Sequence, residues 1–139
     1  MQGHHEYFNI GWLNLDRMFS TIGIMGYWEV VNSNDNDWDL LADILKAISK
    51  KAKEYSERFR MPINVEQIPG ESMSHKLAKA DKLLYGALAE YDLYSNQFIP
   101  MWEKGFTIWE RIKIDGRFNK LVTGGGIVHI QINNHITPS

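Results

Sequence analysis

The sequence has no cysteine among its 139 residues. Disulfides, thiolate zinc sites and thiyl chemistry are therefore outside what the side chains of this chain supply. No apolar run reaches the roughly 20 residues of a membrane-spanning helix, and residues 1–6 lack the basic and apolar regions of a signal peptide. We expect no membrane partner and predict a cytoplasmic location.

Excess charge of either sign is also missing, since the formal net charge is −2. This value gives no electrostatic reason to expect DNA or RNA as a partner, although local backbone dipoles can still hold a phosphate. The hydrophobic content of 44% and the 17 aromatic residues, five Trp, six Tyr and six Phe, are enough for a core. We predict one domain over residues 1–139, with residues 133–139 as a loose polar tail.

Helical periodicity is clearest after the turn cluster at residues 32–37. Apolar residues follow at 38, 41, 44, 45, 48, 52, 55 and 59, and Pro62 ends the pattern. The turn cluster supplies an N-cap. A second helix is predicted from about residue 72 to 84, with Gly86 at its C-terminal cap.

The remaining segments favour short strands. We predict a short strand or buried turn at 7–16, a buried segment at 17–31 that Gly23 and Gly26 interrupt, and strands at 63–68, 93–100 and 127–132. Residues 102–116 fit strand and helix patterns equally. Helices that alternate with short strands indicate an α/β layer or a barrel segment.

The loop between the 63–68 strand and the following helix is the best candidate for a binding site. Glycine lets the backbone approach a ligand, serines offer hydroxyls, and a helix N-terminus offers unpaired amides. A capped helix after a strand needs the same residue types, and a carboxylate at 71 opposes a simple anion site. The candidate phosphate-binding residues are Pro69, Gly70, Glu71, Ser72, Met73 and Ser74.

Other motifs are less specific. The glycines at 124–126 could form a ligand contact or an ordinary turn, and His129 could be a base, a ligand or a structural histidine. Three acidic residues in apolar surroundings, Asp16, Glu29 and Glu66, could have shifted pKa values. His4 and His5 could bind a stray metal, but we expect no metal site, and no nucleophile–base pair, zinc motif or P-loop is present.

Read in order, several motifs resemble the anaerobic (class III) ribonucleotide reductases of the glycyl-radical superfamily. The matching segments are GWLNLDR at 11–17, STIGIMG at 20–26 with Glu29 after it, EQIPGES at 66–72, KLAKAD at 76–81, YSN at 94–96, and LVTGGG at 121–126 followed by His129. The resemblance covers roughly residues 7–132. It implies a partial domain, namely a segment of a ten-stranded α/β barrel that reduces ribonucleoside triphosphates to deoxyribonucleotides by radical chemistry.

The resemblance also implies roles for particular residues and partners. The 69–74 loop would hold substrate phosphates, and Asn96, Thr123, Gly124 and Gly125 would lie near the substrate channel. No catalytic residue lies in this chain. The finger-loop cysteine, the glycyl radical, a structural zinc and a formate or thiol reductant would be supplied elsewhere, and a radical-SAM activase would form the radical.

This sequence departs from the family pattern at three positions. Gly70 stands where alanine is usual, Gly126 stands where serine or another small residue is common, and Gln97 replaces a usual serine or aromatic residue. The glycine predicts a more flexible phosphate loop.

Two hypotheses follow. The chain is one piece of a split reductase, encoded by an interrupted or phage-like gene and acting in the host cytoplasm in the phage case. Alternatively, it is a non-catalytic remnant or nucleotide-binding module. In either case an exposed barrel edge leads us to expect an oligomer.

Overall fold

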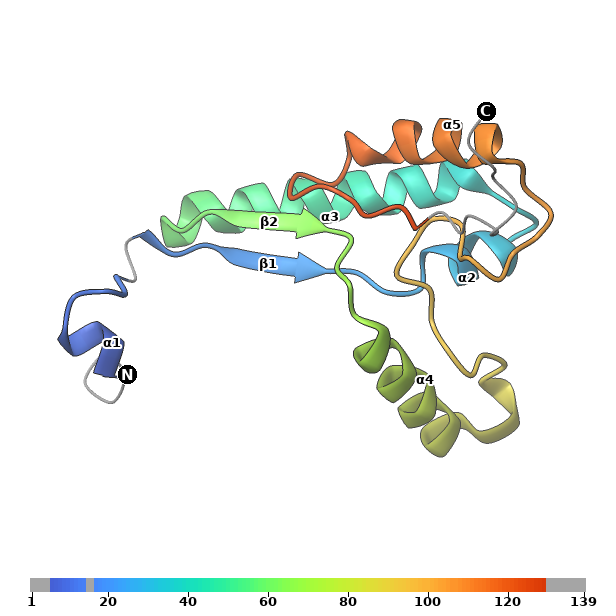
Figure 1. Ribbon diagram of the computed structural model, residues 1–139, viewed down its shortest axis with the longest axis horizontal. Coiled ribbons are helices and arrows are strands. Elements are labelled where there is room, and N and C mark those ends of the chain that lie inside the picture. Colours follow the sequence, from blue (N-terminus) through green and yellow to red (C-terminus); the bar gives the residue numbers. More distant parts are fainter. Residues whose placement is uncertain (1–5, 15–16, 130–139) are drawn as a thin grey trace, which may run out of the picture.

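The computed structural model describes residues 6–14 and 17–129 (Figure 1). The chain contains both helices and parallel strands, which confirms the predicted α/β segment. The elements are α1 (Glu6–Asn9), β1 (Ser20–Gly23), α2 (Tyr27–Asn32), α3 (Trp38–Phe59), β2 (Ile63–Glu66), α4 (Glu71–Tyr85), the 3-10 helix η3 (Gly86–Leu88) and α5 (Ile108–Asn119).

The two strands form a parallel pair in which Ser20 lies opposite Ile63 and Gly23 lies opposite Glu66. A third segment extends this pair, because Gly125 forms a parallel bridge with Glu66. Carbonyl groups alternate between the two edges of a strand. The Val65 carbonyl, which accepts from the Gly124 amide at 2.8 Å, therefore faces away from β1. β2 is thus the central strand of the described residues.

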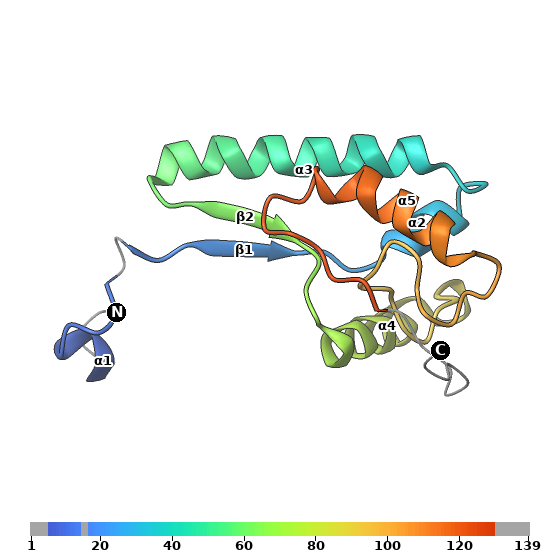
Figure 2. The ribbon, with the colours of Figure 1, turned by 45° about the horizontal axis from the view of Figure 1, so that its top comes forward.

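Helix α3 begins and ends where the sequence predicts. The Asp37 side chain accepts from the amides of Asp39 and Leu40, both at 2.9 Å, which satisfies two unpaired groups at the N-terminus. The helix lies along β2 (Figure 2) and buries most of the predicted apolar face, whereas Tyr55 and Phe59 near its C-terminus are exposed. Its buried residues are Leu41, Ala42, Leu45 and Ala52.

The centre of the core is aromatic and joins distant parts of the chain. Phe98 packs edge-on against Tyr27, with ring centroids 4.9 Å apart, and lies 5.0 Å from Phe118 of α5. All three side chains are at most 1% exposed. The segment around Phe98 is therefore held inside the molecule and positions its neighbours.

The predicted strand at 93–100 is wrong, because this segment contains bends and no strand. Its backbone groups bond to side chains and to single amides instead of a ladder. The Ser95 amide donates to Glu29 Oε1 at 2.8 Å, and the Ser95 carbonyl accepts from Gly26 at 2.7 Å.

Four other expectations need correction or completion. The segment predicted to be buried at 17–31 is buried only in its second half, because residues 17–23, which include all of β1, are exposed. Residues 6–9 form the exposed helix α1 instead of a strand or buried turn, and residues 15–16 lie outside the described part. The ambiguous segment contains α5, which a Thr107–Glu110 capping box begins at residue 108. Residues 127–129 are not in a strand, while the rest of the predicted 127–132 strand and the tail at 133–139 lie outside the described part.

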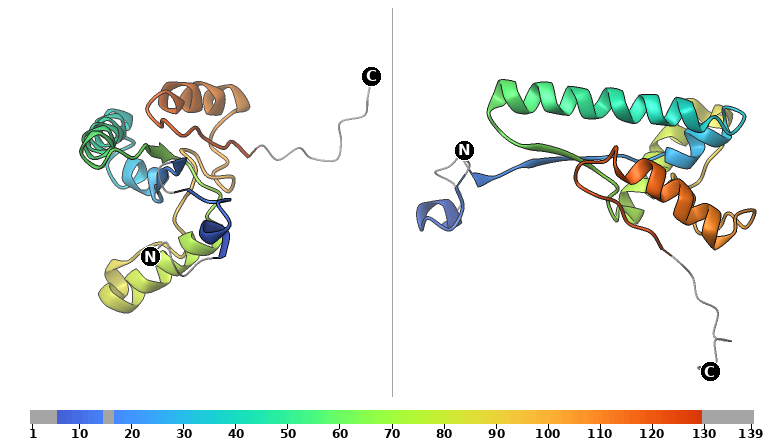
Figure 3. Two further views of the ribbon diagram at one scale, coloured as in Figure 1. Left: turned by 90° about the vertical axis from the view of Figure 1, so that its left-hand side faces the viewer. Right: turned by 90° about the horizontal axis from the view of Figure 1, so that it is seen from above.

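Helix α4 projects away from the layer that contains α3, the strands and α5 (Figures 1 and 3). Its buried residues are Ser74 and Ala78, so most of its surface is exposed. Within residues 6–14 and 17–129, no helix combines the length and apolar character that a membrane crossing requires.

Candidate functional site

The 69–74 loop leads directly into the first turn of α4. Gly70 is the N-cap residue, and no side chain accepts from the first amides of the helix. The amide of Ser74 bonds to the Gly70 carbonyl at 2.8 Å and starts the helical pattern. The amides of residues 71–73 are thus the unpaired donors that a helix N-terminus presents to an anion.

The two serines of the loop differ in position. Ser74 is 1% exposed and its hydroxyl donates to the Tyr94 carbonyl, so this serine attaches α4 to the 93–97 segment. Ser72 is exposed, as are Pro69 and Met73. Of the two predicted hydroxyls, Ser72 is the one left at the surface of the loop.

Glu71 and Asn96 meet beside the helix start. The Asn96 amide donates to the Glu71 carboxylate at 3.4 Å and to the Ile68 carbonyl at 3.3 Å. The carboxylate is therefore directed toward the 93–97 segment. Two predicted site residues that are distant in sequence are brought together here.

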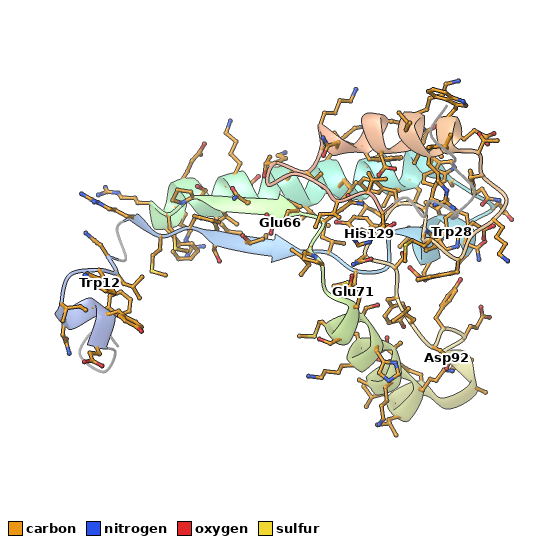
Figure 4. The ribbon with its side chains drawn as sticks, viewed as in Figure 1. Trp12, Trp28, Glu66, Glu71, Asp92 and His129 are labelled. Atoms are coloured by element: carbon orange, nitrogen blue, oxygen red, sulfur yellow. The ribbon has the colours of Figure 1, made fainter. Side chains whose placement is uncertain are left out.

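A small pocket of about 50 Å³ adjoins this contact. Glu71 and Ser74 line it from α4, and Asn96 and Gln97 line it from the 93–97 segment. His129 lines it from the C-terminal side. Figure 4 shows Glu71 at the start of α4 and His129 above it, near the carboxyl ends of the strands. Gln97 Nε2 lies 2.6 Å from His129 Nδ1. No spacing in the sequence predicts that Gln97 and His129 form a pair.

The remaining predicted channel residues lie along β2. Thr123 Oγ1 accepts from the Val65 amide at 3.0 Å, and the Gly124 amide donates to the Val65 carbonyl. Thr123, Gly124 and Gly125 are not among the residues that line the small pocket. A Cβ on Gly124 would lie 2.8 Å from Glu66 Cβ, so glycine permits this close approach to the strand.

A buried carboxylate fixes the segment that carries Asn96 and Gln97. Glu29 is 6% exposed and accepts from both the amide and the hydroxyl of Ser95, at 2.8 and 2.6 Å. The Ser95 hydroxyl in turn accepts from the Trp28 amide at 2.9 Å. The sequence identified Glu29 as an acidic residue in apolar surroundings but not its partner.

Tyr94 also connects the 93–97 segment to α4. Its hydroxyl donates to Asp81 at 2.5 Å, and this bond, with a contribution from burial, raises the pKa of Tyr94 to about 12. The phenol therefore stays protonated at neutral pH and acts as a donor. In the part of the chain that the structure describes, no cluster of three or more His, Cys, Asp or Glu residues is placed to hold a metal ion.

Comparison with known proteins identifies relatives along nearly the whole chain. A family model described as anaerobic ribonucleoside-triphosphate reductase matches residues 5–138. A protein of enterobacteria phage T4, the anaerobic ribonucleoside-triphosphate reductase, is 24% identical over 97 residues, which are 68% of this chain and 16% of the phage protein.

Solved structures give the same result. The Thermotoga maritima anaerobic ribonucleotide reductase with citrate in the active site is 27% identical, with a TM-score of 0.78, over 91% of this chain and 26% of that one. The same enzyme in complex with dATP and CTP is 26% identical, with a TM-score of 0.76, over 89% and 23%. The chain therefore spans about a quarter of the length of these solved relatives.

Proposed function

The chain belongs to the anaerobic ribonucleoside-triphosphate reductase family, and from this premise we propose that it acts as one segment of such a reductase. It contributes barrel wall and a phosphate-holding loop to the reduction of ribonucleoside triphosphates to deoxyribonucleotides. The cysteine comes from another segment, because this chain has none, and the proposal assigns the glycyl radical to another segment as well.

The uncapped start of α4 is the observation that carries the proposed binding role. Of the three helices longer than ten residues in the described part, α3 and α5 have side-chain caps, from Asp37 and Thr107, and α4 has none. A phosphate group at this position would accept from the free amides and interact favourably with the helix dipole.

A hydrogen bond to Glu71 weakens the main objection to an anion at this helix. The carboxylate accepts from Asn96, which directs it to the side of the helix start. A Thermotoga relative was solved with CTP, so CTP is the ribonucleotide with which to test this chain.

The test is a calorimetric titration of the chain with CTP, comparing wild type with Ser72→Asp. An aspartate in the first helical turn interacts favourably with the helix dipole but repels phosphate. We expect affinity to fall at least about tenfold with no loss of thermal stability. Asn36→Asp adds the same charge on the exposed turn before α3 and should leave the affinity unchanged. Equal CTP affinity of wild type and Ser72→Asp would contradict the phosphate loop.

The segment role is tested separately by co-expression with the family segments that carry the cysteine and the radical glycine. We expect a stoichiometric complex that reduces CTP after activation. A chain that binds CTP but forms no complex would support the non-catalytic nucleotide-binding module instead.

A further inference from the structure

The contact between Gln97 and His129 relates the orientation of the Gln97 amide to the nitrogen of the imidazole that carries a proton. Gln97 Nε2 lies 2.6 Å from His129 Nδ1, and Gln97 is 6% exposed. An amide NH₂ group donates hydrogen bonds and does not accept them. With the amide nitrogen of Gln97 toward the ring, Nδ1 is the acceptor and the proton of a neutral ring lies on Nε2.

The position of the Gln97–His129 pair indicates a role for the His129 Nε2 proton in ligand binding. His129 and Gln97 both line the small pocket beside the start of α4, together with Glu71 and Asn96. Because Nδ1 is occupied by Gln97, the ring group left for a ligand is the Nε2–H donor. No ion pair joins Glu71 and His129 among the salt bridges of the described residues.

The volume of the pocket limits what enters it. The pocket measures about 50 Å³, which is room for a few water-sized groups. A whole nucleotide does not fit, but one oxygen-bearing group of a nucleotide held at the α4 N-terminus does.

We propose that Gln97 holds His129 as the Nε2–H tautomer, and that His129 donates this hydrogen bond to an acceptor oxygen of the ribonucleotide bound at the start of α4. His129 is thus a binding residue and Gln97 a positioning residue. The ligand part rests on the proposed function, whereas the tautomer is a property of the free chain. The oxygen belongs either to a phosphate or to the nucleoside, and both accept from a neutral imidazole.

The tautomer is tested by NMR on the ¹⁵N-labelled chain. An N–H···N hydrogen bond transmits a ¹⁵N–¹⁵N scalar coupling, so we expect a cross-peak between Gln97 Nε2 and His129 Nδ1. Exposed His75 on α4 is the internal reference and should show none. Gln97→Met should abolish the coupling, and Gln97→Glu, which can only accept when ionised, should move the proton to Nδ1. A protonated Nδ1 in the wild-type chain, with no coupling, would overturn the assignment.

The ligand contact is tested by titration with CTP. His129→Leu should weaken binding about tenfold, the effect of one hydrogen bond to a charged group. His129→Gln should retain most of the affinity, because its amide places a donor near the position of Nε2. Gln97→Met should weaken binding less than His129→Leu. Equal affinity of wild type, His129→Leu and His129→Gln, with unchanged thermal stability, would overturn the proposed contact.

Titrations with two further ligands show whether the oxygen that accepts from His129 lies on a phosphate or on the nucleoside. If His129→Leu weakens inorganic tripolyphosphate as much as CTP, the acceptor is a phosphate oxygen. If it weakens CTP and cytidine but not tripolyphosphate, the acceptor lies on the nucleoside. Failure of the wild-type chain to bind CTP would remove both the proposed function and this contact, while the NMR coupling would still decide the tautomer.

Discussion

At the scale of single residues, the two glycines that contact the site region have different reasons for being glycine. A Cβ on Gly70 would lie 2.1 Å from Met25 Cε, the terminal methyl of a flexible side chain. Gly70 has φ −123° and ψ 40°, so its backbone is outside the left-handed region that favours glycine. A Cβ on Gly124 would instead meet Glu66 Cβ, which is fixed to the backbone of β2.

This difference predicts the outcome of two alanine substitutions. Gly70→Ala should change the free energy of unfolding by less than about 1 kcal/mol, because Met25 can move and alanine restricts the unfolded chain. Gly124→Ala should cost about 1–3 kcal/mol, because the strand itself must shift. Urea denaturation of both variants measures the difference, and equal stabilities would show that β2 accommodates the methyl group.

Asp115 predicts how stability depends on pH. Its ordinary pKa in an unfolded chain is about 3.9, and burial raises its pKa to about 6 in the folded protein. The folded state therefore holds more protons than the unfolded state between about pH 4 and 6. The contribution of Asp115 to stability is greatest below this interval and falls as pH rises through it.

Asp115→Asn removes this ionisation. We expect the variant to be more stable than wild type by about 1 kcal/mol at pH 7, a value reduced because the carboxyl group is only partly buried, and to equal it near pH 4. Urea denaturation at both pH values is the measurement. Asp35→Asn, on an exposed turn, is the matched control, and a constant difference across pH for Asp115→Asn would argue against burial as the cause.

At the scale of elements, α3 depends on its cap. Asp37→Ala removes the acceptor for two amides and should lower the free energy of unfolding by about 1–2 kcal/mol. Asp43→Ala removes an aspartate of the same helix whose ion pair with Lys46 is exposed, and should change it by less than about 0.5 kcal/mol. Thermal unfolding of both variants is sufficient, and equal losses would mean that the cap adds nothing beyond surface charge.

The elements also show how far the sequence predicts this fold. Periodicity, Asp37 and Gly86 predicted α3 and α4 within about one residue at each end. The capping box of α5 is visible at Thr107 and Glu110, but the alternation of apolar residues obscured it. The 93–100 segment could not be predicted, because its conformation depends on Glu29, which lies 66 residues from Ser95.

In the candidate site, too, the sequence predicted local features but not tertiary contacts. The loop at 69–74 was predicted because strand, turn and helix start are local features. The contacts of Asn96 with Glu71 and of Gln97 with His129 are tertiary, and no spacing in the sequence predicts them. Thr123–Gly125 remain predicted channel residues, although their backbone and hydroxyl groups bond to Val65 along β2.

At the scale of the whole molecule, apolar side chains remain uncovered where α4 ends. Leu83 and Leu84 of α4 and Leu88 of η3 are 80%, 73% and 85% exposed, at the end of the helix that projects from the rest of the chain (Figure 1). Apolar side chains that gather on one exposed element favour association. An uncovered apolar surface of this kind is consistent with a chain that aligns with only about a quarter of the length of its solved relatives.

We therefore expect the isolated chain to self-associate through this surface. Leu84→Glu/Leu88→Glu should shift the sedimentation profile toward monomer, because two charges disfavour apolar contact. Lys50→Gln/Lys53→Gln on α3 changes the net charge by the same amount and should leave the profile unchanged. Identical profiles for wild type and the leucine variant would place the self-association elsewhere.

The central position of β2 also has a consequence for the order of events during synthesis. Its second neighbour is supplied by residues 123–125, and Val65 and Thr123 are 58 residues apart. Pairings between distant segments form slowly, and unpaired strand edges favour aggregation while they persist. A nascent chain can join β1 to β2 early, but it completes the sheet only after Gly125 has left the ribosome. Slow translation between residues 66 and 125 would therefore prolong the lifetime of an open strand edge.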